Sequence, residues 1–116
     1  MKLIKGGVTA PNGFLAGSAS CGIKKSGKTD LALLCSRVPC MAAGTFTTNR
    51  VKSGSVVLCI ERLKKGVSQA VIVNSGNANC CVGKREIQDA REITEAVSAK
   101  LKIKKDLMLM ASTGII

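Results

Sequence analysis

The sequence predicts an α/β (α+β) fold that is dominated by a β-sheet and carries one long amphipathic helix. Apolar runs of strand length recur along the chain, residues 84–101 have helical periodicity, and a further apolar run follows at residues 107–110. Turn-forming residues separate these runs, and no internal repeat or linker divides the chain. We therefore expect residues 1–116 to form a single domain or part of one.

Composition limits the classes of protein to which the chain can belong. Apolar residues make up 46% of the sequence and charged residues 22%, a balance typical of globular proteins rather than disordered ones. No apolar run approaches the ~20 residues needed to span a bilayer. The first residues contain no apolar segment typical of a secretory signal. We expect a cytoplasmic protein that does not enter membranes.

The chain is strongly basic, with 18 lysine and arginine residues, 7 acidic residues and a net charge of +11. Such a charge favours nucleic-acid binding. However, Phe14 and Phe46 are the only aromatic residues, so surfaces on which bases could stack are scarce. We interpret the charge as a solvated surface that attracts anionic small molecules. A basic nucleic-acid-binding domain is kept as an alternative.

A β-hairpin is predicted after a turn-rich amino-terminal segment. Residues 15–24 and 31–38 carry the small and apolar side chains of two strands, and the polar residues 25–30 form the turn between them. Residues 25–29 end in Gly-Lys-Thr, like a Walker A phosphate loop. They lack the first glycine of that motif and no helix pattern follows them, so we interpret them as the tip of the hairpin.

Three further strands are expected in the middle of the chain. Residues 40–48 combine small residues with β-formers, and Gly44 marks a bulge or a close approach of two segments. Residues 56–60 and 67–73 are short apolar runs typical of buried strands. The second of these runs leads into residues 74–79, a loop whose small and amide-bearing side chains can place hydrogen-bond donors at the edge of a sheet.

Residues 84–101 are predicted to form the long amphipathic helix. Their apolar side chains recur at intervals of three or four, whereas most charged side chains lie on other faces. Acidic residues cluster early in the segment and lysines late, as the helix dipole favours. The apolar positions are Ile87, Ala90, Ile93, Val97 and Leu101.

The last apolar run, residues 107–110, is uninterrupted enough to predict a strand that is covered on both faces. Three small residues, Ser112, Thr113 and Gly114, follow it. A buried strand that ends in such residues can hold hydrogen-bond donors rigidly at the mouth of a sheet. Taken alone, the three residues are more typical of a strand followed by a turn.

The residue types exclude several kinds of catalytic site. The chain contains no histidine, so a Ser-His or Cys-His nucleophile is excluded within it. No pair of acidic residues suggests glycoside hydrolysis or metal binding. The cysteines lack the Cys-x-x-Cys spacing typical of zinc sites, so we expect buried free thiols and no metal. The cysteines are Cys21, Cys35, Cys40, Cys59, Cys80 and Cys81.

Hydrogen-bond donors are what these exclusions leave. They are supplied by Thr113, by Gly114 and by the loop at residues 74–79. Preplaced N–H and O–H groups stabilise the oxyanion that forms during acyl transfer. Donors without a nucleophile therefore amount to half of an acyl-transfer site, and the residues alone indicate nothing more specific.

Seven blocks of sequence, taken together and in order, match a known family: residues 6–11, 22–27, 30–33, 43–52, 73–79, 89–92 and 111–116. They closely resemble the amino-terminal part of the α chain of the glutamate N-acetyltransferase/ornithine acetyltransferase family of arginine biosynthesis. The resemblance covers essentially the whole chain. It is specific because several blocks agree in both sequence and spacing.

The resemblance implies an enzyme that moves an acetyl group from N2-acetylornithine to glutamate, with acetyl-CoA as a co-substrate in some members and no other cofactor. Members of this family are made as precursors that cleave themselves before a threonine, which gives α and β chains. The freed threonine is the nucleophile and its own α-amino group can serve as the base, which suits a chain without histidine. The implied fold is a layered α/β sandwich with mixed sheets.

By position, the resemblance assigns Thr113 and Gly114 to the oxyanion hole. The self-cleaving threonine and the substrate-binding residues of the β chain lie beyond residue 116 in this family. We therefore expect the remainder of the α chain and the β chain as partners in a hetero-oligomer. We also expect the 116-residue chain alone to be inactive. The alternative is a truncated, non-catalytic fragment that acts as a binding or assembly module.

Overall fold

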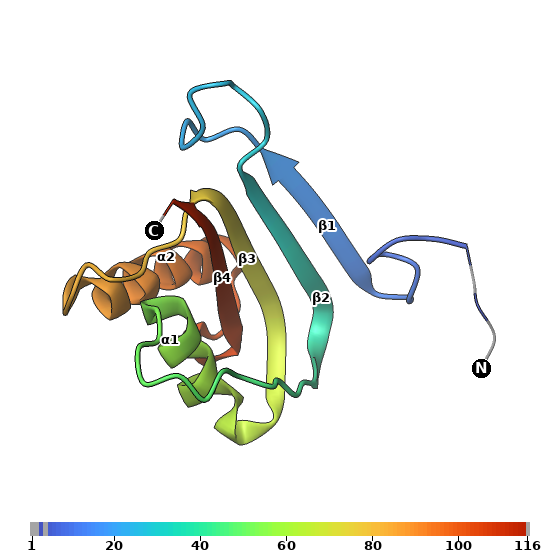
Figure 1. The fold of residues 1–116 in the computed structure, drawn as a ribbon. Coiled ribbons are helices and arrows are strands. Elements are labelled where there is room, and N and C mark those ends of the chain that lie inside the picture. Colours follow the sequence, from blue (N-terminus) through green and yellow to red (C-terminus); the bar gives the residue numbers. More distant parts are fainter. Residues whose placement is uncertain (1–2, 4, 116) are drawn as a thin grey trace.

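Four strands form one mixed sheet in the computed structural model, which describes residue 3 and residues 5–115 (Figure 1). The strands are β1 at Phe14–Ala19, β2 at Leu31–Met41, β3 at Val67–Asn77 and β4 at Met108–Ile115. They lie in the order β1-β2-β3-β4. Pairing is antiparallel from β1 to β3 and parallel between β3 and β4.

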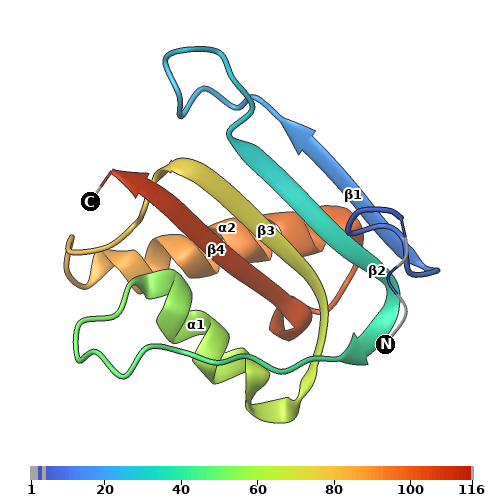
Figure 2. The ribbon, with the colours of Figure 1, turned by 45° about the vertical axis from the view of Figure 1, so that its right-hand side comes forward.

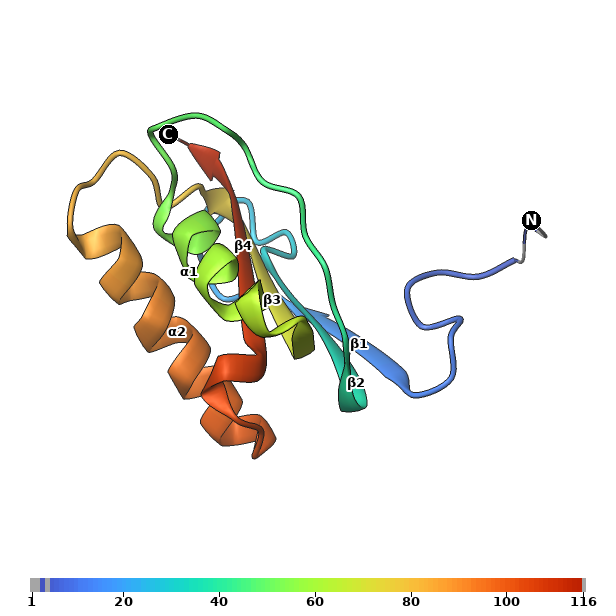
Figure 3. The same cartoon turned by 90° about the horizontal axis from the view of Figure 1, so that it is seen from below.

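Two helices cover one face of this sheet, α1 at Gly54–Arg62 and α2 at Arg85–Leu101 (Figures 2 and 3). Helix α2 connects β3 to β4, since parallel strands need a long crossover connection. Single turns of 3-10 helix, at Leu63–Lys65 and Lys105–Leu107, precede β3 and β4. The α/β class, the mixed sheet, the β1-β2 hairpin and the long helix are therefore confirmed.

Helix α1 corrects the prediction of a buried strand at residues 56–60. Ser53 caps the start of the helix, and its hydroxyl accepts a hydrogen bond from the Val56 amide at 3.4 Å. The buried side chains recur at helical spacing, but a serine and an arginine among them hide the pattern from a reading based on hydropathy. They are Ser55, Leu58, Cys59 and Arg62.

The segment between β2 and α1 also differs from the prediction, because the strand expected at residues 40–48 ends at Met41. The chain from there to α1 contains neither helix nor strand and passes along the β4 side of the molecule (Figure 3). Gly44 is a point of close approach, as the sequence indicated. A Cβ atom there would lie 2.9 Å from the Phe46 ring.

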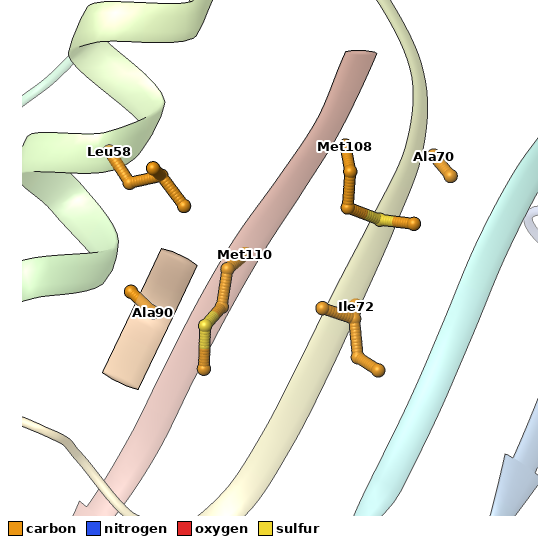
Figure 4. Close-up of a cluster of buried hydrophobic side chains, with 6 residues drawn as sticks. All are labelled: Leu58, Ala70, Ile72, Ala90, Met108 and Met110. Carbon is orange, nitrogen blue, oxygen red and sulfur yellow. The ribbon is translucent and has the colours of Figure 1, made fainter. Parts of the chain in front are cut away.

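The core lies between the two helices and the strands β3 and β4 (Figure 4). Successive side chains of a strand point to opposite faces, and the buried even-numbered residues of β3 and β4 face the helices. Each larger side chain buried here stabilises the fold by roughly 1.5–3 kcal/mol relative to an exposed one. The buried cluster comprises Leu58, Ala70, Ile72, Ala90, Met108 and Met110.

The buried face of α2 is rotated from the predicted one, because Ile93 is 40% exposed. Close packing between the helices favours small residues, and a Cβ atom at Gly54 of α1 would lie 2.2 Å from the carbonyl of Glu86. The Thr94 hydroxyl, although buried, is satisfied within the helix because it donates to the Ala90 carbonyl at 2.8 Å. The buried residues of α2 are Ala90, Thr94 and Ser98.

The other face of the sheet carries no helix within the described part of the chain (Figure 3). On this side Leu109 is half-buried and Ala111 is exposed. The prediction that the last strand is covered on both faces is therefore wrong. Both helices pack on the side of Met108 and Met110, which leaves the alternate residues of β4 on the open face.

The cysteines are all free, but only Cys59 is buried, so the expectation of buried thiols is wrong for the other five. Within residue 3 and residues 5–115, no group of three or more His, Cys, Asp or Glu side chains could hold a metal ion. No helix in the same part of the chain combines the length and the apolar character needed to cross a membrane.

Candidate functional site

The predicted site residues lie at the carboxyl end of β4 and inside the strand itself. Ser112, Thr113 and Gly114 were expected to follow the strand, but β4 continues through them because each pairs with a residue of β3. The partners are Asn74, Ser75 and Gly76. The loop expected at residues 74–79 therefore begins only after Asn77, where β3 ends.

β4 is an edge strand, and its successive residues turn their backbone groups in opposite directions. The Ile115 carbonyl accepts a hydrogen bond from the Ala78 amide at 3.1 Å, which places the odd-numbered residues of β4 in the ladder with β3. The even-numbered residues consequently direct their N–H and C=O groups toward the free edge. Gly114 is one of these residues, so its amide points away from β3.

Helix α1 covers the first half of this free edge. The Met108 carbonyl accepts a hydrogen bond from Arg62 Nη1, and the Met110 carbonyl accepts one from the Cys59 thiol at 3.2 Å. Burial lowers the pKa of the Arg62 guanidinium and raises the pKa of the Cys59 thiol. Gly114 lies four residues beyond Met110, the last of these bonded residues of β4, and is exposed.

Thr113 lies on the open face of the sheet, on the same side as Leu109 and Ala111, and is exposed. The amide of Gly114, the next residue, points off the free edge. Two hydrogen-bond donors are thus accessible at adjacent positions, one above the open face and one beside the edge. An acceptor oxygen placed at this corner of the sheet could meet both donors, which is the arrangement that an oxyanion requires.

Gly114 is a position where only glycine fits. Its φ angle is +138°, and a Cβ atom there would lie 2.4 Å from the carbonyl carbon of Gly76 and 2.5 Å from the Asn77 nitrogen. Gly76 is restricted in the same way. Its φ angle is +120°, and a Cβ atom there would lie 2.7 Å from the side chain of Ile23. The paired glycines therefore let β4, β3 and the hairpin tip come together, where the hairpin tip is the connection at residues 20–30 between β1 and β2.

A buried carboxylate, Asp30, fixes the hairpin tip against the sheet. It is 2% exposed, and its oxygens accept hydrogen bonds from the Cys21 amide at 2.7 Å and the Lys24 amide at 2.9 Å. These two bonds hold the pKa of the Asp30 carboxyl far below its usual range. Its own backbone carbonyl accepts from the Ser75 amide at 2.8 Å, which ties the loop to β3.

The sequence reading placed Asp30 only in a polar turn and missed this role. The signal that could have found it is that Asp30 is the only acidic residue among the first 60 residues of a basic chain. The carboxylate also raises the pKa of the neighbouring Cys21 thiol, chiefly through a hydrogen bond. Cys21 is therefore not an activated nucleophile.

The asparagines at the end of β3 brace the turn toward α2. Asn74 Nδ2 donates to the Asn77 carbonyl at 2.7 Å, and Asn79 Nδ2 donates to the Glu86 carbonyl at 3.0 Å. The Asn77 side-chain oxygen accepts from the Asn79 amide at 3.0 Å. Because these groups bond within the chain, they give the candidate site support rather than additional free donors.

A hollow of about 670 Å³ opens beside Gly114, between the hairpin tip and the carboxyl ends of β3 and β4. Its lining contains two lysines and no acidic side chain. A more enclosed cavity of about 470 Å³ lies against α2, is lined largely by apolar side chains and contains neither site residue. The hollow beside the site is lined by Ile23, Lys24, Lys25, Ser75, Gly76, Gly114 and Ile115.

Comparison with known sequences gives matches along the whole chain. Two relatives are the arginine biosynthesis bifunctional proteins ArgJ of Symbiobacterium thermophilum, 51% identical, and of Caldanaerobacter subterraneus, 44% identical. Each match covers 100% of this chain. The chain spans only 29% and 28% of the length of these two relatives.

Two solved structures share the fold with a TM-score of 0.91. One is the ArgJ protein of Bacillus halodurans, 34% identical, where the match covers 96% of this chain and 58% of that one. The other is ornithine acetyltransferase from Mycobacterium tuberculosis in complex with ornithine, 42% identical over 95% of this chain and 60% of that one. The ArgJ family model matches residues 15–116. Since that match takes in both helices and all four strands except the first residue of β1, the chain belongs to the ArgJ family.

Proposed function

We propose that this chain is the amino-terminal part of the α chain of an acetyltransferase of arginine biosynthesis that passes the acetyl group of N2-acetylornithine to glutamate. The names of the relatives support the pathway, and the ornithine bound in the Mycobacterium tuberculosis structure supports the substrate class. The observation that carries the proposal is the exposed pair of donors, the Thr113 hydroxyl and the Gly114 amide, at the free corner of β4.

The two donors would act on charge that develops on the acetyl carbonyl oxygen. When a nucleophile attacks that carbon, the C=O bond becomes a C–O⁻ bond, and the hydroxyl and the amide donate to the oxygen. The amine of ornithine then leaves with a proton and an acetyl-enzyme remains, which the amine of glutamate attacks in the same way. Removal of one such donor typically costs about 2.7–4 kcal/mol of transition-state stabilisation.

The rest of the site would come from the part of the protein that this chain does not contain. The resemblance assigns the nucleophile to a threonine beyond residue 116, freed by self-cleavage, with its own α-amino group as base. The partners would be the remainder of the α chain and the β chain in a hetero-oligomer. Acetyl-CoA would serve as an alternative acetyl donor to the same nucleophile. This scheme involves no redox step and no metal ion.

An acetyl-transfer assay tests the proposal. We define the completed protein as this chain joined, after residue 116, to the part of the Symbiobacterium thermophilum relative that lies beyond its own matched segment. Labelled acetyl should pass from N2-acetylornithine to glutamate with the completed protein and not with the 116-residue chain alone. Transfer by the chain alone, or no transfer by the completed protein, would contradict the proposal.

The alternative of a nucleic-acid-binding domain gains no support from the structure. Phe14 is half-buried in β1, and Phe46, although 36% exposed, has its ring against Gly44. They are the only aromatic residues of the chain, so they offer no extended surface for base stacking. A gel-shift assay with duplex DNA measures this directly, since phosphate contacts would give binding that falls steeply with salt. We expect no shift at physiological salt.

A further inference from the structure

The hollow beside Gly114 combines a fixed loop, a floor of glycine and two positive charges. We propose that Lys24 and Lys25 bind the carboxylate of the amino-acid substrate there, next to the donors of the candidate oxyanion hole. This inference rests on the proposed function, because it assigns a group of the same substrate to a neighbouring part of the same site.

The hairpin tip holds its position without a ligand. The amides of Cys21 and Lys24 both donate to the buried Asp30 carboxylate, and the Asp30 carbonyl accepts from β3. The Gly27 amide closes the turn on the Lys24 carbonyl at 3.1 Å. Because the backbone of Lys24 is already bonded on both sides, a ligand that binds its side chain need not pay for ordering the loop.

The floor of the hollow brings the lysine stem close to the site. A Cβ atom at Gly76 would lie 2.7 Å from Ile23 and 3.3 Å from Cγ of Lys24, so the Lys24 side chain packs directly over this glycine. Gly76 is the register partner of Gly114 on β4. The aliphatic part of the Lys24 side chain therefore lies over β3, one strand away from the Gly114 amide that is proposed to donate to the oxyanion.

The charges of the hollow are available to an anion. Lys24 is half-buried, and among the described residues its ammonium donates only to the Thr29 carbonyl, at 3.3 Å and in an exposed position where a carboxylate could replace it. Lys25 is exposed. Asp30, the acidic residue of this loop, already accepts from two amides inside the turn. Lysine binds carboxylates as a compact charge with three donors.

The chemistry of the proposed substrates matches this arrangement. In N2-acetylornithine the carboxylate is attached to the carbon that carries the acetylated nitrogen, and glutamate has the same group beside its attacking amine. In a substrate whose carbonyl oxygen lies at Thr113 and Gly114, the carboxylate is therefore only a few bonds from that oxygen. The distance between the two groups is similar to the spacing of two neighbouring strands, ~4.8 Å. The lysines would bind both substrates in turn at one place.

Steady-state kinetics of the completed protein test the assignment. We expect Lys24→Gln and Lys25→Gln to raise the KM for both N2-acetylornithine and glutamate about tenfold each, since a hydrogen bond to a charged group is worth roughly 1.5–3 kcal/mol. The value of kcat should change less than about twofold, because the lysines would bind the substrate equally well in the ground state and in the transition state. Lys25→Arg, which keeps the positive charge, should leave both KM values close to those of the unaltered protein.

Lys28→Gln is the matched control, because Lys28 belongs to the same hairpin tip and does not line the hollow. An active completed protein whose KM values are unaltered by Lys24→Gln and Lys25→Gln, or are raised equally by Lys28→Gln, would overturn this inference alone. A rise confined to the KM for acetyl-CoA would assign the lysines to its phosphates and also overturn it. An inactive completed protein of unaltered sequence would overturn the proposed function, and the carboxylate assignment with it.

Discussion

The two halves of β4 share one strand geometry and differ in what lies against their free edge. In the first half, Met108 and Met110 are buried and their outward carbonyls accept hydrogen bonds from α1. In the second half, Thr113 and Gly114 are exposed and the Gly114 amide points off the same edge. An edge strand can thus be a structural element along one half and a source of donors for a ligand along the other.

The largest effect is expected from Gly114→Ala, which changes the exposed half. The added Cβ atom would lie 2.4 Å from the β3 backbone at a φ angle of +138°, so the strands must separate. We expect a loss of roughly 2–5 kcal/mol in the free energy of unfolding, measured with urea, from overpacking and backbone strain together. Acetyl transfer by the completed protein should fall with it.

Gly17→Ala in β1 is the control for this change, because a Cβ atom at Gly17 meets nothing within 4 Å. It should alter the free energy of unfolding by about 0.5 kcal/mol or less. Equal effects of the two substitutions would mean that β3 and β4 do not approach at Gly114 as described.

The next largest effect is expected from Arg62→Ala, which uncovers the structural half. The substitution leaves the buried Met108 carbonyl without the partner that Arg62 supplies, at a cost of about 1.5–3 kcal/mol in the free energy of unfolding. The kcat per folded molecule should not change, since Arg62 is remote from the donors. Arg91→Ala, which removes an exposed ion pair with Glu61, should cost about 0–1 kcal/mol. A lower kcat for Arg62→Ala would break the division of β4 into two halves.

The effect of Asp30→Asn depends on pH and is smallest in acid. At neutral pH asparagine keeps one oxygen for the loop but places an NH2 group opposite the amide that bonded to the other oxygen, so the stabilisation by the charged carboxylate is lost. The folded pKa of Asp30 lies far below its unfolded value of about 3.9, so its stabilisation is complete well above that value and is lost as the pH falls below it. Unfolding measured between pH 2 and about 5 should depend less on pH in Asp30→Asn. The exposed Asp106→Asn change, the control, should leave that dependence intact. The same slope in Asp30→Asn as in the unaltered chain would contradict the role given to Asp30.

The parts of the fold that depend on local patterns were predictable. Helix α2 and the β1-β2 hairpin follow from the spacing of apolar residues and from a glycine-containing turn. Helix α1 did not, because the apolar run at residues 56–60, rich in valine and isoleucine, is typical of a strand, whereas the buried face of the helix includes Ser55 and Arg62. The cap at Ser53 was the local signal, and it is weak without knowledge of what α1 packs against.

The candidate site was predictable only in its residues and not in its geometry. The resemblance to a family gave Thr113 and Gly114, but the need for glycine arises from the approach of Gly76, which is 38 residues earlier and known only once the strands pair. Asp30 and the hollow beside Gly114 likewise depend on a contact between the hairpin tip and β3. Contacts between distant segments leave no periodic signal in a sequence.

The most direct test compares the kcat of Thr113→Ala and Ser112→Ala in the completed protein. The two hydroxyls are adjacent but lie on opposite faces, and Ser112 Oγ is buried with no hydrogen-bond partner among the described residues. Thr113→Ala should lower kcat by about 100- to 1000-fold, as loss of an oxyanion donor does, whereas Ser112→Ala should change it less than about threefold. Equal kcat values for the two variants would contradict the account.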